Sequence, residues 1–111
     1  GVTSSDIIDT AFSVQLKQSC SILQRELKRL SNNLKVKSLN FKNTACIGRS
    51  HGIFAEPTTF GLKMLAKYCE FERHYKRLCD AEKQISICSI SGAVGTFAHI
   101  SPNIEKIVSK K

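Results

Sequence analysis

The chain has 111 residues, of which 41% are hydrophobic, and its 17 basic and 9 acidic residues give a formal net charge of +8 at pH 7. No run of about 18 apolar residues occurs, which excludes a membrane-spanning helix, and the composition is typical of a cytoplasmic protein. The five cysteines are odd in number and form no CxxC pair, so neither a disulfide framework nor a zinc site is predicted. We expect the cysteines to be small buried side chains, and we expect no cofactor and no metal.

A long amphipathic helix is predicted from about residue 6 to residue 37. Thr3–Asp6 offers several N-cap candidates, and apolar residues then recur at steps of three and four, which is the spacing of one helix face. At about 1.5 Å per residue, this helix would be about 48 Å long. We expect the apolar stripe to be core, and its members are Ile8, Phe12, Leu16, Cys20, Leu23, Leu27, Leu30 and Leu34.

The centre of the chain is a histidine between two glycines. Gly48 and Gly52 allow backbone conformations that other residues avoid, so His51 can be presented at a turn beside Arg49 and Ser50. Histidine is the side-chain type that titrates nearest neutral pH, which suits it to proton transfer. The pattern therefore indicates a candidate catalytic residue, although a histidine between glycines is also typical of an ordinary turn.

The second half of the chain predicts two more helices and a turn. Glu56–Thr59 has the pattern of a helix start, with proline at the first helical position, and this helix is expected to run to about residue 88. Ser38 to Ala45 is a polar connection, and no strand alternation is found. Ser91–Thr96 is predicted to be a turn whose backbone N–H groups can meet an anion, and Ser101–Pro102 begins a last helix.

These elements predict an all-α fold of long antiparallel helices. A compact domain of about 100 residues has a radius of gyration near 13 Å, which is too small for helices of about 48 Å. We therefore expect the chain to form part of an oligomeric helical bundle, in which other chains cover the remaining apolar flank.

Four segments resemble the adenylosuccinate lyase family of the fumarase and aspartase superfamily. They are Thr3–Ala11, Gly48–Gly52, Ala55–Lys63 and Ser91–Thr96, and the resemblance extends over residues 1 to about 104 in the order and spacing of that family. The resemblance implies an enzyme of purine biosynthesis that eliminates fumarate from adenylosuccinate, giving AMP, and from succinylaminoimidazole carboxamide ribotide. It also implies a homotetramer in which three subunits contribute to each active site.

The resemblance also implies roles for individual residues. His51 matches the acid that protonates the departing nitrogen, while Thr3, Ser4 and Ser50 match contacts to the dicarboxylate part of the nucleotide substrate. Ser50 stands where the family more often has threonine. Ser91 matches a position that lines the active site. The family's catalytic-base loop lies downstream of this chain and an Arg-His-Asp segment lies upstream. Residues 1–111 are therefore interpreted as a central piece of the helical-bundle domain, inactive by itself.

Two alternatives stay open. The parent protein could be another fumarate-releasing lyase of the same superfamily, of the argininosuccinate or carboxymuconate type. From charge alone, the region from Arg25 to Lys42 could instead form a basic helical hairpin that binds nucleic acid. Against the second alternative, only Phe41 interleaves with those basic residues, and no helix-turn-helix spacing is present.

Overall fold

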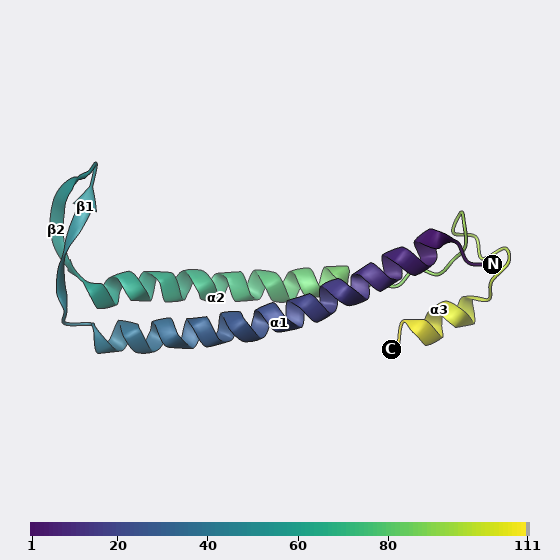
Figure 1. The fold of residues 1–111 in the computed structure, drawn as a ribbon, viewed down its shortest axis with the longest axis horizontal. Helices are drawn as coiled ribbons and strands as arrows, with labels where there is room; N and C mark the ends of the chain where they lie inside the picture. Colours follow the sequence, from purple (N-terminus) through teal and green to yellow (C-terminus); the bar gives the residue numbers. More distant parts are fainter. Residues whose placement is uncertain (111) are drawn as a thin grey trace. The chain divides into compact units, whose positions relative to one another are not determined.

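The computed structural model describes residues 1–110 and is mostly helical (Figure 1). Its elements are α1 (Ser4–Asn40), β1 (Ala45–Ser50), β2 (Ile53–Thr59), α2 (Phe60–Ile85) and α3 (Pro102–Val108). The predicted helical class is confirmed, and the expectation that the chain has no strand is wrong. The chain divides into two compact units. The first unit combines Gly1–Ile22 with the chain from Cys79 onward, and the second unit is Leu23–Leu78.

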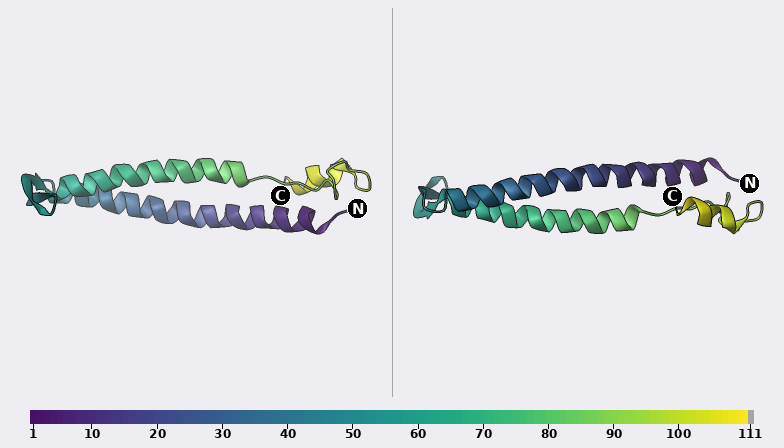
Figure 2. Two further views of the ribbon diagram at one scale, coloured as in Figure 1. Left: turned by 90° about the horizontal axis from the view of Figure 1, so that it is seen from above. Right: turned by 90° about the horizontal axis from the view of Figure 1, so that it is seen from below.

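The second unit is a helical hairpin extended by the small sheet. Within it, the later part of α1 and the earlier part of α2 lie side by side and antiparallel (Figures 1 and 2). The hydroxyl of Ser31, a fully buried residue, donates to the Glu72 carboxylate, and Lys28 Nζ lies 5.2 Å from the centre of the Tyr75 ring. Polar and cation–π contacts therefore join the two helices in this unit.

The junction between the sheet and α2 fixes where the second helix begins. Thr59 Oγ1 accepts a hydrogen bond from Leu62 N at 3.1 Å, so Thr59 is the N-cap and the helix begins at Phe60. The predicted start at Glu56–Pro57 is wrong, because Pro57 belongs to β2, where it lies opposite Ile47. Both strands of a two-stranded sheet are edge strands, so the missing N–H of a proline is tolerated.

The first unit contains the beginning of α1, the end of α2, an irregular segment and α3. α2 ends at Ile85, three residues before the predicted end, and the segment that follows includes Gly92 and Gly95 with φ angles of 86° and 75°. The predicted turn is therefore present. α3 begins as predicted, because the side chain of Ser101 caps it and Pro102 occupies its first position.

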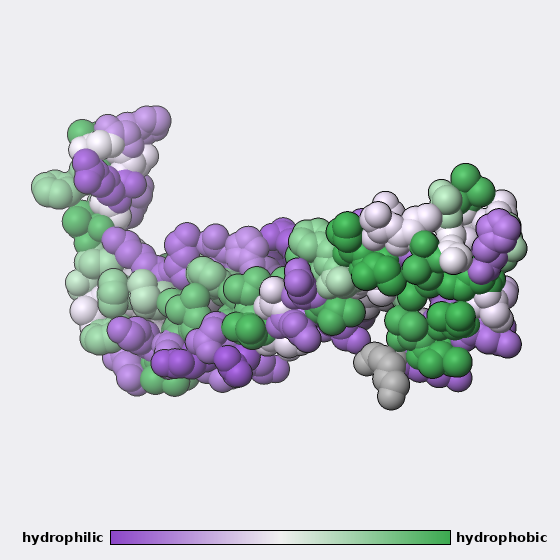
Figure 3. All heavy atoms as spheres, turned by 45° about the vertical axis from the view of Figure 1, so that its right-hand side comes forward, coloured by the Kyte–Doolittle hydropathy of each residue, from purple (hydrophilic) through white to green (hydrophobic). Residues whose placement is uncertain are grey.

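Only half of the predicted apolar stripe on α1 is covered in the described chain. Cys20 is buried and Leu16, Leu27 and Leu34 are half-buried, whereas Ile8, Phe12, Leu23 and Leu30 are exposed. The expectation that the whole stripe is core is therefore wrong for this chain alone. Neighbouring segments cover only one side of the helix, and that side also carries the buried polar residues Asp6, Ser31 and Ser38. Figure 3 shows apolar side chains remaining at the surface.

The described residues contain no helix long and apolar enough to cross a membrane. Among the same residues, no group of three or more histidine, cysteine or acidic side chains could hold a metal ion. All five cysteines are free thiols; Cys20 is buried as expected, but Cys69 is exposed, so the expectation of burial is wrong there.

Candidate functional site

His51 lies in the two-residue loop that joins β1 to β2. Ser50 pairs with Ile53, and the φ angles of His51 and Gly52 are 50° and 79°. Two positive φ angles in a two-residue hairpin loop are the geometry of a type I′ turn, whose twist matches that of the strands. His51 is exposed. The structure thus places the imidazole in a turn, as the flanking glycines predict, and its catalytic role stays a prediction.

Gly48 is required in the same hairpin because there is no room for a side chain, and not because of its φ angle. Two residues of β2, Ala55 and Glu56, face Gly48 alone, which makes a β-bulge between the Ile47 and Arg49 pairs. A Cβ atom at Gly48 would lie 2.7 Å from the Glu56 carbonyl oxygen. The bulge therefore requires a residue without a side chain.

A pocket of about 480 Å³ lies on the hairpin. Its lining residues are Arg49, Gly52, Ile53 and Phe54. Phe54 is 83% exposed, so the apolar wall of this pocket is open in the single chain. Ser50, a predicted substrate contact, is exposed beside it. The second unit therefore carries two of the predicted site residues, Ser50 and His51, next to an apolar hollow with one guanidinium group.

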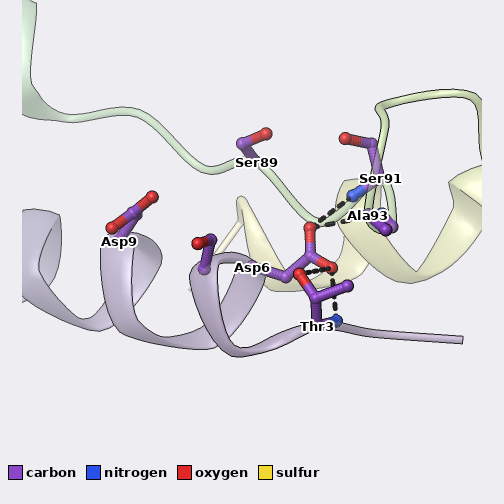
Figure 4. Close-up of a pocket in the computed structure, with 8 residues that line it drawn as sticks. Thr3, Asp6, Asp9, Ser89, Ser91 and Ala93 are labelled. Carbon is purple, nitrogen blue, oxygen red and sulfur yellow. Dashed lines mark hydrogen bonds between the residues drawn. The ribbon is translucent and has the colours of Figure 1, made fainter.

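A second pocket, of about 360 Å³, lies in the first unit (Figure 4). It brings together Thr3 and Ser91, two of the predicted substrate contacts, although they are far apart in the sequence. Ser4 is exposed and is not among the lining residues. Hydroxyl and carboxylate groups dominate the wall, and they include those of Ser5, Asp6, Asp9 and Ser89. The hydroxyl groups of this wall can donate hydrogen bonds to a bound group, whereas Asp6 and Asp9 give the wall negative charge and none of the described lining residues is cationic.

The carboxylate of Asp6 joins the two segments that form this second pocket. Asp6 is only 6% exposed, and its Oδ2 accepts from Thr3 N at 2.8 Å. Its Oδ1 accepts from Ser91 N at 3.0 Å and from Gly92 N at 3.2 Å (Figure 4). The hydrogen bond from Thr3 N lowers the pKa of Asp6, and those from Ser91 and Gly92 lower it further against the opposing effect of burial. Asp6 therefore stays ionised in the folded chain.

From its position before the apolar repeat, Asp6 is only one of several N-cap candidates. Thr3 and Asp6 have the spacing of a capping box, in which an acidic side chain reaches back to the N–H of the cap residue, and this signal could have identified the contact. The bonds to Ser91 and Gly92 span 85 and 86 residues and have no local signal. Two N–H groups of the segment that the sequence predicts to be able to meet an anion, those of Ser91 and Gly92, are bonded to this carboxylate of the chain itself.

The other two histidines lie outside these pockets or at their edge. Nδ1 of His74 lies 3.3 Å from Arg77 Nη1, and its Nε2 lies 3.6 Å from Glu70 Oε1 on the surface of α2. His99 is exposed in the turn before α3 and helps line a small hollow of about 260 Å³. His74 thus has partners that account for its position on the helix.

Several known proteins similar to this chain are lyases. Residues 1–111 match the model of a family described as lyase. The sequence is 45% identical over 108 residues to adenylosuccinate lyase of Staphylococcus saprophyticus, which covers 97% of this chain and 25% of that relative. A fumarate lyase from Mesorhizobium sp. BNC1 has a TM-score of 0.92 at 28% identity, covering 99% of this chain and 27% of that structure.

A more distant structure extends the comparison. The 3-carboxy-cis,cis-muconate lactonizing enzyme from Pseudomonas putida has a TM-score of 0.88 at 26% identity, over 99% of this chain and 25% of its own. The chain thus spans about a quarter of the length of each of these relatives. Because the family match extends over residues 1–111, the chain belongs to the lyase family of the fumarase and aspartase superfamily, with adenylosuccinate lyase among its relatives.

Proposed function

We propose that the chain is the central part of a longer lyase that eliminates fumarate from adenylosuccinate, giving AMP, and from succinylaminoimidazole carboxamide ribotide. The observation that carries this proposal is the 45% identity to an adenylosuccinate lyase over 97% of the chain. The identities to the fumarate lyase and to the muconate enzyme, 28% and 26%, are much lower. Substrate preference follows sequence likeness more closely than it follows fold.

In the proposed reaction, a base outside this chain removes a proton from the carbon beside a carboxylate of the succinyl group. The electron pair forms the double bond of fumarate, the carbon–nitrogen bond breaks, and His51 donates a proton to the departing nitrogen. An exposed imidazole at the tip of a tight hairpin can approach a substrate held by another part of the assembly. We therefore assign His51 the role of general acid.

We assign the contacts to the substrate's carboxylates to hydroxyl groups in both units. Thr3, Ser4 and Ser91 belong to the first unit and Ser50 to the second. The assignment is best supported for Thr3 and Ser91, because both line the 360 Å³ pocket. Hydroxyl donors can hold carboxylate oxygens without a permanent counter-charge.

We further propose that the parent protein is a homotetramer with shared active sites. The apolar stripe of α1 supports association, because Ile8, Phe12 and Leu23 are all more than half exposed in the single chain. Exposed apolar stripes on long helices are usually covered by neighbouring helices in a bundle.

The test is a substrate panel with the full-length protein, assayed for fumarate release and, for a carboxymuconate, for loss of the substrate itself. Adenylosuccinate and succinylaminoimidazole carboxamide ribotide should be cleaved, while argininosuccinate should not. The P. putida relative makes a carboxymuconate the second candidate substrate, and it should remain unchanged. Turnover of the carboxymuconate in place of adenylosuccinate would reject the proposal.

The nucleic-acid hypothesis finds less support in the described structure. Arg25 and Arg29 both lie 3.4 Å from carboxylate oxygens of Glu26, and Lys28 lies over the ring of Tyr75. Part of the basic surface is therefore already partnered within the chain. Duplex binding with a steep salt dependence by the full-length protein would favour this hypothesis over the lyase proposal.

A further inference from the structure

Four consecutive backbone N–H groups in the first unit donate to side chains instead of to other backbone. Ser89 N donates to Thr10 Oγ1 at 3.4 Å, and Ile90 N donates to Glu105 Oε2 at 2.8 Å. Ser91 N and Gly92 N both donate to Asp6 Oδ1, at 3.0 and 3.2 Å. Thr10 Oγ1 also lies 3.3 Å from Ser89 O, to which it can donate. Residues 89–92 are thus held at every amide by side chains of α1 and α3.

These side-chain acceptors take the place of the backbone hydrogen bonds to a neighbouring strand that an extended segment would otherwise make. Buried N–H groups require partners, and hydrogen bonds to ionised carboxylates are among the stronger ones. Asp6 and Glu105 supply three of the four bonds from two different helices. The conformation of residues 89–92 therefore depends on two carboxylates that are not neighbours of it in the sequence.

The held segment has an inner and an outer side. Ile90 is buried, with 4% exposure, while Ser89 and Ser91 on either side of it line the 360 Å³ pocket together with Thr3 (Figure 4). Alternation of this kind is expected in extended backbone. Because Asp6 already occupies the N–H groups of Ser91 and Gly92, a bound anion would have to be met by the hydroxyl groups.

We propose that Asp6 and Glu105 are positioning residues, which hold residues 89–92 so that the Ser89 and Ser91 hydroxyls face the carboxylate-binding pocket of the lyase. The proposal rests on the proposed function for the nature of the ligand. Neither carboxylate takes part in the chemical step. Both act through the backbone that carries the serine side chains, and Asp6 also fixes Thr3 on the opposite side of the pocket.

The experiment measures amide hydrogen exchange of residues 89–92 and steady-state kinetics with adenylosuccinate, both in the full-length enzyme. In Asp6→Ala and Glu105→Ala, exchange in this segment should become faster by about tenfold or more, because each variant removes hydrogen bonds to a charged acceptor. KM should rise by about tenfold, whereas kcat should change by less than about threefold, since the proton-transfer groups are untouched.

Conservative variants separate positioning from a general loss of structure. Glu105→Gln keeps one carbonyl acceptor for its single donor, Ile90 N, and should restore both exchange and KM almost fully. Asp6→Asn keeps only one carbonyl acceptor, whereas Asp6 accepts from Thr3 N on one side and from Ser91 N on the other. Its exchange rate and KM should therefore lie between those of the wild type and of Asp6→Ala. Asp80→Asn is the matched control, because the Asp80 side chain is 67% exposed and paired only with Lys83 among the contacts described.

Unchanged exchange at residues 89–92 in both alanine variants would overturn the proposal that Asp6 and Glu105 hold this segment. Faster exchange with an unchanged KM would show that the two carboxylates hold the segment but do not affect substrate binding. A KM for Glu105→Gln as high as that for Glu105→Ala would also overturn the positioning role. Failure of the wild-type enzyme to cleave adenylosuccinate would instead reject the proposed function, and the exchange measurement would still decide whether the two carboxylates hold the segment.

Discussion

Substitutions at Gly52 test whether the hairpin that presents His51 depends on a left-handed backbone. The φ angle of Gly52 is 79°, and a Cβ atom added there would have no heavy atom within 4 Å. A side chain at this position therefore meets no steric obstacle, and its whole cost is conformational. This makes Gly52 a cleaner test of backbone strain than the neighbouring glycine of the bulge.

The expected magnitude follows from two opposing effects. A residue with a side chain pays about 1–2 kcal/mol in the left-handed region. Replacing glycine by alanine also restricts the unfolded chain, which offsets about 0.4–1 kcal/mol. Gly52→Ala should therefore lower the free energy of hairpin opening by about 1 kcal/mol, which is about a fivefold change in the open population. Gly52→Val should cost more and Gly52→Asn less, because asparagine tolerates this region.

The assay is amide hydrogen exchange of the paired residues of β1 and β2 in the full-length protein, which reports local opening. Gly48→Ala is the comparison, because its Cβ would lie 2.7 Å from a backbone oxygen and should cost about 1–3 kcal/mol by crowding. Equal exchange in Gly52→Ala, Gly52→Val and Gly52→Asn would refute the strain argument, since the three differ mainly in their tolerance of a positive φ.

Three further predictions concern the parent enzyme and the chain by itself. His51→Ala should lower kcat by about 10²–10⁴-fold with little change in binding, and His51→Gln should not restore turnover, because an amide cannot supply the proton. A near-normal kcat with only a lower melting temperature would make His51 a structural turn residue. Ser50→Ala should impair turnover and Ser50→Thr should be nearly silent, because threonine keeps the hydroxyl; equal activity in all three would remove Ser50 from the site. The isolated chain should self-associate through exposed apolar residues such as Phe12, and light scattering that shows a concentration-independent monomer would contradict this.

The sequence by itself determined the features that depend on neighbouring residues. The presence of one long helix follows from the three- and four-residue apolar spacing, although α1 extends from Ser4 to Asn40 where the spacing predicts residues 6 to 37. The start of α3 follows from a serine cap before a proline. The turn at His51 follows from its flanking glycines, and the family follows from several short segments in a fixed order. Apart from the family, which rests on segments spread along the chain, each of these features is predicted by residues within it or directly beside it.

The tertiary structure alone decided the features that depend on distant partners. Local pattern favoured a helix start at Pro57, but pairing with Ile47 makes that residue part of a strand, and Thr59 then caps the helix. The same holds for Asp6, whose local signal is a helix cap and whose further partners lie 85 and 86 residues away. Spacing predicts that α1 has an apolar face, but only the packing of other segments decides which side of a helix is buried, because burial is a property of the surroundings and not of the helix.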